Sequence, residues 1–108
     1  METQAIENQQ LTLDILVYEE DGVWVADCVQ LQVIHVDPDI NKAFEVCKNL
    51  CRAQILYATE NDPDFEHLFH PPDKRLMRIM AMASRAGVVD IEINTTHVTV
   101  NRLLAHAA

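Results

Sequence analysis

The dipeptide Asp21-Gly22, between two runs of alternating apolar residues, constrains the fold of this chain more than any other feature. Residues 11–18 place an apolar side chain at every second position, which is the period of a β-strand, and residues 23–29 resume an apolar run. Asp-Gly favours a two-residue turn whose twist matches that of the flanking strands. We therefore expect a hairpin, and the β-branched residues 31–36 predict a third strand that extends it into an antiparallel meander.

A long amphipathic helix is predicted to cover one face of this meander. The apolar residues of 40–58 follow helical spacing over about five turns, and polar residues occupy the other side. Asp39 is a suitable N-cap, and Asn61-Asp62-Pro63 ends the pattern because the residue before a proline disfavours helical geometry. The expected helix spans 39–60.

The remaining third of the chain predicts a second helix and a pair of strands. After a proline-containing loop at 62–72, Asp73 can cap a helix over 73–86, with Gly87 at the position just past its end. Strands are expected at 88–93 and 98–100. The fold class is α+β, within a single domain of residues 1–108 whose polar segment 1–10 we expect to be frayed.

Charge is unevenly distributed along the 108 residues, whose net charge is −9. Residues 1–70 carry 14 acidic and 3 basic side chains, whereas residues 71–108 carry 3 acidic and 5 basic ones. An acidic body repels phosphate and attracts a basic protein, although the acidity could also serve only solubility. We therefore expect no nucleic-acid partner. We also expect no membrane partner, because the N-terminus lacks a basic, apolar signal and no apolar run approaches the length of a membrane span. Three cysteines fit a reducing, cytoplasmic compartment.

The hairpin and the helix entry resemble the N-terminal domain of HicB-type antitoxins. The resemblance lies in the segment 17–26, which reads VYEEDGVWVA, in Leu31, and in Asp39 followed by Ala43 in the helix. It covers residues 11–58, less than half of the chain. It implies a βββα core with a further strand and helix.

The same resemblance implies a function by protein–protein contact. HicB-type antitoxins lack catalytic carboxylates, bind a small basic toxin that cleaves mRNA, and commonly oligomerise. On this basis we expect a non-enzymatic protein that needs no cofactor, and we assign partner binding to the acidic hairpin tip and its aromatic neighbour. These residues are Glu19, Glu20, Asp21 and Trp24.

Two alternative functions remain open from the residues. One alternative is a zinc or enzymatic site whose four ligands would be Cys47, Cys51, His67 and His70. Both cysteines also fall on the apolar face of the predicted helix, where cysteine packs as a small core residue. We favour the core interpretation and expect no metal site. The basic residues of 74–85 could instead make the chain a nucleic-acid-binding transcriptional regulator.

Asp14 and Asp27 could approach each other across the first two strands, where we expect a solvent-exposed pair and no catalytic site. No nucleotide-binding glycine motif or catalytic serine motif is present.

Apolar residues of the C-terminal third exceed what one sheet face requires, so we expect a homodimer. The alternative is that the second helix folds back and covers these strands within one chain. The expected interface residues are Met77, Met80, Ile91, Ile93, Val98 and Val100.

Overall fold

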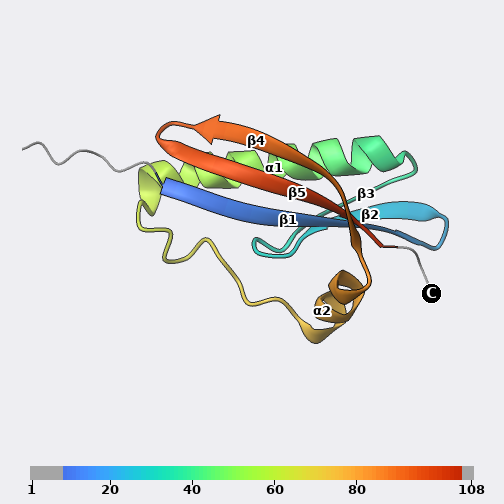
Figure 1. Cartoon of the computed structure of the whole chain (residues 1–108). Coiled ribbons are helices and arrows are strands. Elements are labelled where there is room, and N and C mark those ends of the chain that lie inside the picture. The colour runs from blue at the N-terminus through green and yellow to red at the C-terminus, as the bar shows by residue number, and fades with distance from the viewer. Residues whose placement is uncertain (1–8, 106–108) are drawn as a thin grey trace, which may run out of the picture.

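In the computed structural model, which describes residues 9–105, the chain forms an α+β fold with five strands in one mixed sheet and two helices (Figure 1). The α+β class expected from the sequence is confirmed. The elements in chain order are β1 (Gln9–Glu20), β2 (Val23–Cys28), β3 (Val33–Asp37), α1 (Ile40–Asn61), α2 (Lys74–Ala81), β4 (Ser84–Ile93) and β5 (Thr96–Leu104).

The first three strands are antiparallel neighbours in the sheet, whose order is β3-β2-β1-β5-β4. Glu20 pairs with Val23 at the end of the first hairpin. Asp21 has φ 53° and Gly22 φ 82°, the positive values that a two-residue hairpin turn requires. The turn residues therefore set the register of the hairpin.

β1 lies at the centre of the sheet because β5 returns to pair with its other edge. This pairing is parallel and runs from Gln9 opposite Thr96 to Val17 opposite Leu104. β4 then pairs antiparallel with β5 and forms one edge of the sheet, while β3 forms the other edge. The parallel pairing was not predicted, since hairpin signals report only on neighbours in sequence.

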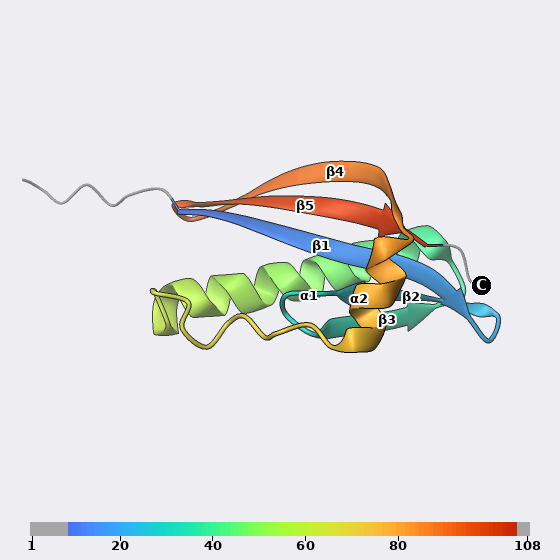
Figure 2. The ribbon, with the colours of Figure 1, turned by 60° about the horizontal axis from the view of Figure 1, so that its bottom comes forward.

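The two helices lie on opposite faces of the sheet (Figures 1 and 2). α1 packs on the face that carries Leu13, Ile15 and Val17 of β1, together with the inward side of β5. α2 packs on the other face, through a smaller cluster that includes Leu16 and Leu76. Both faces of β1 are therefore buried, which explains why its sequence departs from strict alternation at Leu16.

α1 begins where predicted. The carboxylate of Asp39 accepts hydrogen bonds from the amides of Asn41 and Lys42, at 2.8 and 3.0 Å, and so satisfies two of the free donors of the first turn. The helix ends at Asn61, before the Asp62-Pro63 pair.

The second helix is shorter than predicted, and the strands after it are longer. α2 ends at Ala81, where the amides of Met82 and Ala83 bond to the carbonyls of Ile79 and Met80 in a tightened final turn. β4 starts at Ser84 because that residue pairs with Leu104. Gly87 is therefore not past a helix end but inside β4, beside the irregularity in its pairing with β5.

The expected frayed segment 1–10 lies largely outside the described residues, and Gln9 and Gln10 belong to β1. Among the described residues, no helix is long and apolar enough to cross a membrane.

Candidate partner-binding surfaces

The β1–β2 hairpin tip presents an acidic surface. Glu19, Glu20 and Asp21 are all exposed, and the turn places them at the end of the sheet (Figure 1). Arg75 of α2 binds the carboxylate of Glu20 at 2.8 Å and lies over the ring of Tyr18. The guanidinium therefore fixes one side of the tip, and the other two carboxylates face solvent.

Trp24 contributes only partly to this surface. It is half-buried and packs against the core beneath α1, whereas Tyr18 is buried on the opposite face beside α2. The aromatic residues therefore do not form one exposed patch. The three carboxylates lie at the tip as the sequence predicts, and the half-buried Trp24 beside them is only partly accessible to a partner.

A second surface is a groove of about 560 Å³ between α1, the start of β3 and the loop after α1. Its walls are mainly apolar and include Leu50 and Tyr57 of α1, which are 44% and 67% exposed. These two residues, with Ala53 and Gln54, follow helical spacing about a quarter turn from the core-facing stripe of α1. Leu50 fits the periodicity of the core stripe, so the sequence pattern does not reveal this second face.

The loop after α1 carries three carboxylates, of which one lines the groove. Asp62 lines the groove, and Asp64 and Glu66 are exposed on the same loop; these three residues form what we call the acidic rim. Asp62 accepts hydrogen bonds from the amides of His67 and Glu66, and these bonds lower its pKa below the ordinary value. The Asp62 carboxylate therefore remains charged at neutral pH.

The four residues of the alternative zinc site are not brought together. Cys47 and Cys51 are buried under the sheet with Cys28, while His67 and His70 line the groove. The Cys51 thiol has a raised pKa because its neighbouring cysteines and its burial disfavour the thiolate. No group of three or more potential metal-ligating side chains is found in the part of the chain that the structure describes.

Asp27 is buried, which the sequence analysis did not foresee. It pairs with Leu16 and Ile34, so it does not oppose Asp14, and its side chain lies on the α2 face of the sheet with only 3% exposure. Its Oδ1 atom has no hydrogen-bond partner among residues 9–105. Burial, reinforced by the charge of Asp73 and opposed by Arg75, raises its pKa from 3.8 to about 6. Asp14 instead bonds to the side chains of Gln30 and Asn101.

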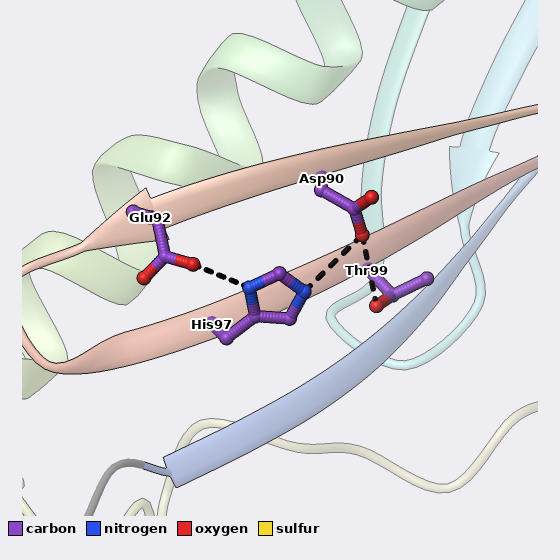
Figure 3. Close-up of polar contacts among 4 residues, drawn as sticks. All are labelled: Asp90, Glu92, His97 and Thr99. Atoms are coloured by element: carbon purple, nitrogen blue, oxygen red, sulfur yellow. Dashed lines mark hydrogen bonds and ion pairs between the residues drawn. The ribbon is translucent and has the colours of Figure 1, made fainter.

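A histidine lies between two carboxylates near the β4 edge (Figure 3). The ring of His97 contacts Glu92 through Nδ1 and Asp90 through Nε2, the latter at 3.2 Å, and Thr99 also bonds to Asp90. The contact with Glu92 raises the pKa of His97 because it favours the protonated ring. This cluster joins β4 to β5 on the face of the sheet opposite α1, where Asp90 and Glu92 are exposed, and no sequence motif predicts it.

The six residues of the expected dimer interface have different environments. Ile93, Val98 and Val100 are buried in the core beneath α1, and Ile91 packs against the same core. They are therefore covered within one chain, but by the long first helix and not by α2. Met80 belongs to α2 and packs against the smaller cluster between α2 and the sheet, so of the six only Met77, at 51% exposure, offers a large apolar surface.

Comparisons with known proteins provide no relative: no family model, no curated protein and no solved structure matches this chain.

Proposed function

We propose that this chain is a non-enzymatic protein-binding module with the role of a HicB-type antitoxin, whose partner is a small basic protein. The observation that carries the proposal is the hairpin tip, where Glu19, Glu20 and Asp21 extend from a turn of defined geometry. The salt bridge from Arg75 to Glu20 reduces the freedom of the tip, so that less entropy is lost when a partner binds.

Charge supports a basic partner. Residues 1–70 carry most of the acidic side chains, and the field of such a surface accelerates encounter with a positively charged protein. A small mRNA-cleaving toxin must itself be basic to hold phosphate, so a carboxylate cluster can occupy the same surface that its RNA substrate requires.

The proposal is tested by purifying the tagged protein from its own host. We expect a stoichiometric basic polypeptide of fewer than about 100 residues, whose ribonuclease activity is inhibited by the complex. Recovery of only nucleic acid, or of no basic protein, would contradict the proposal.

The site is tested with charge-reversed variants in titration calorimetry against that polypeptide. Glu19→Lys/Asp21→Lys should raise the Kd at least about tenfold, through the loss of two charge contacts. The control Glu60→Lys/Asp64→Lys makes the same change in net charge at exposed positions at the far end of α1 and in the loop after it, and should have a smaller effect because salt screens distant charges. Equal effects of the two variants would refute binding at the tip.

A further inference from the structure

The segment that contains α2 is attached to the sheet at its two ends. Before the helix, the amide of His70 donates a hydrogen bond to the carbonyl of Gln30 at 2.8 Å, and after it β4 begins at Ser84. Between these points, residues 72–83 make no backbone hydrogen bond to another segment in the described part of the chain. Only side chains therefore hold α2 on the sheet.

Few side chains of α2 make this contact. Of its eight residues Leu76 is buried, and Ile79 and Met80 are partly buried against the same cluster. Arg75 adds an exposed salt bridge to Glu20 at 2.8 Å. A helix of eight residues is not stable by itself in water, so α2 keeps its shape only while these contacts persist.

A carboxyl group without a partner lies beneath this short helix. Asp27 is 3% exposed on the face of β2 that α2 covers (Figure 2), and its Oδ1 has no hydrogen-bond partner among residues 9–105. Its neighbours on the adjacent strands are Leu16 and Ile34, whose side chains cannot donate a hydrogen bond. A buried carboxylate that lacks a partner destabilises the arrangement that buries it.

The charged groups that face this carboxyl do not compensate for its burial. The negative charge of Asp73 repels it, and the Asp73 side chain is already engaged as the cap of α2, where it accepts a bond from a helix amide at 2.7 Å. The charge of Arg75 attracts it, but the guanidinium is bonded to Glu20 and lies over the ring of Tyr18. Burial and Asp73 together outweigh Arg75, so the pKa of Asp27 rises to about 6.

We propose that α2 is a lid, hinged at residues 71–73 and 82–83, that opens more often when Asp27 is ionised. When the carboxyl is protonated, the lid lies on a neutral surface and stays closed. When the carboxyl is charged, the open form becomes more favourable, because it returns the carboxylate to water while the rest of the sheet remains folded. The hinges are the short stretches between the helix and the two attachment points of the segment.

Opening of the lid changes the surface beside the acidic hairpin tip. It uncovers apolar side chains of the sheet that include Leu16, Val25 and Val29. It also separates Arg75 from Glu20, because the guanidinium leaves with the helix. The opening is a property of this chain alone; only its link to partner binding at the tip rests on the proposed function.

Native-state hydrogen exchange tests the lid without a partner. At pH 7 we expect the amides of residues 78–81 in α2 to be protected at least about tenfold less than those of Cys51 and Ile55 in α1. Low concentrations of urea should leave the exchange of α2 unchanged, because the lid exposes little surface when it opens, but should accelerate the exchange of α1 through global unfolding. An equal dependence on urea in both helices would overturn the proposal, since α2 would then open only with the whole protein.

Asp27→Asn tests whether the carboxyl controls the lid. The pKa of Asp27 is 3.8 in water and about 6 beneath the closed lid. Relative to the unmodified protein, the variant should therefore raise the protection factors of α2 about 100-fold at pH 7 and only slightly at pH 4. The matched control Asp21→Asn, at the exposed tip, should change them at neither pH. An equal effect of Asp27→Asn at both pH values, or no effect at pH 7, would overturn the role of the carboxyl.

Leu76→Ala opens the lid by a different route. It removes the buried apolar contact of α2 and leaves the carboxyl in place, so it should lower the protection factors of α2 at least about tenfold even at pH 4. Unchanged exchange of α2 in this variant would show that the cluster around Leu76 does not hold the helix closed, and would overturn the lid.

Discussion

Replacing Asp27 by asparagine should stabilise the protein at neutral pH and not in acid. Asp27 is buried beside Leu16, Val25 and the first turn of α2, and its Oδ1 has no hydrogen-bond partner within the part of the chain that the structure describes. The unfolded chain returns this carboxyl to water, where its pKa is 3.8, while burial and the charge of Asp73 raise the folded-state pKa to about 6. The charged form is therefore disfavoured by folding.

The magnitude follows from the two pKa values. A difference of about two pH units corresponds to about 3 kcal/mol. Below pH 3.8 both states hold the proton, and the carboxyl costs no pH-dependent stability. As the pH rises from 3.8 to about 6, the folded state keeps a proton that the unfolded state loses, so stability falls; above about 6 the loss is complete. Asparagine has the same shape and cannot ionise, so Asp27→Asn should avoid this loss.

Urea unfolding at pH 4, 5, 6, 7 and 8, followed by the fluorescence of Trp24 and by circular dichroism, measures the effect. The free energy of unfolding of Asp27→Asn relative to the unmodified protein should increase by about 3 kcal/mol between pH 4 and pH 7 and then remain constant. Asp21→Asn is the control, because it removes a carboxylate at the exposed hairpin tip, where the change should be within about 0.5 kcal/mol. If the difference for Asp27→Asn were the same at every pH, the carboxyl would be solvated in the folded protein and our reasoning would be refuted.

Three further predictions concern other parts of the chain. The three buried cysteines should react with a thiol reagent at pH 8 at a rate limited by local or global unfolding of the protein, so urea should accelerate labelling steeply. Rapid labelling without urea would show that a thiol is accessible in the folded protein. Glu92→Gln should lower the pKa of His97 in an NMR titration, because the Glu92 carboxylate favours the protonated ring. The contact stabilises the fold at low pH, and this stabilisation is lost as the pH rises through the raised pKa of His97. An unchanged titration of His97 would exclude the contact. Ile55→Ala should cost about 2–5 kcal/mol in urea unfolding because Ile55 is buried between α1 and the sheet, and a cost near that of the exposed Val88→Ala would be inconsistent with this packing.

Local sequence signals predicted those elements whose geometry depends on neighbouring residues. Asp21-Gly22 specified the hairpin because only a turn with positive φ connects the two strands, and Asp39 and Asp73 specified both helix starts because their carboxylates satisfy free amides. The end predicted for α2 was wrong, because residues 84–86 have helical propensity but gain more free energy by joining β4, which pairs with β5.

The candidate surfaces were predicted less completely than the fold. The acidic tip follows directly from three adjacent carboxylates in a turn. The groove does not, because Leu50 fits the periodicity of the core stripe and only the shape of the following loop leaves it uncovered. The burial of Asp27 was misassigned. Alternation places its side chain on the face of β2 that does not carry Trp24 and Ala26, and a meander covered by one helix leaves that face to solvent. In the structure, α2 covers it. A short helix after a proline-containing loop gives no local indication of where it packs.

The parallel pairing of β1 with β5 has a consequence for how this protein is made. Asp14 bonds to Asn101, 87 positions later in the sequence, so the central strand lacks one of its neighbouring strands until those later residues have been synthesised. During synthesis, the meander and α1 can meet while Leu13, Ile15 and Val17 still lack the neighbouring strand that completes their cover. Contacts between such distant segments slow folding, and an unpaired central strand is a site of misassembly for nascent chains. The central strand of this protein is therefore most prone to misassembly in the interval before β5 is synthesised.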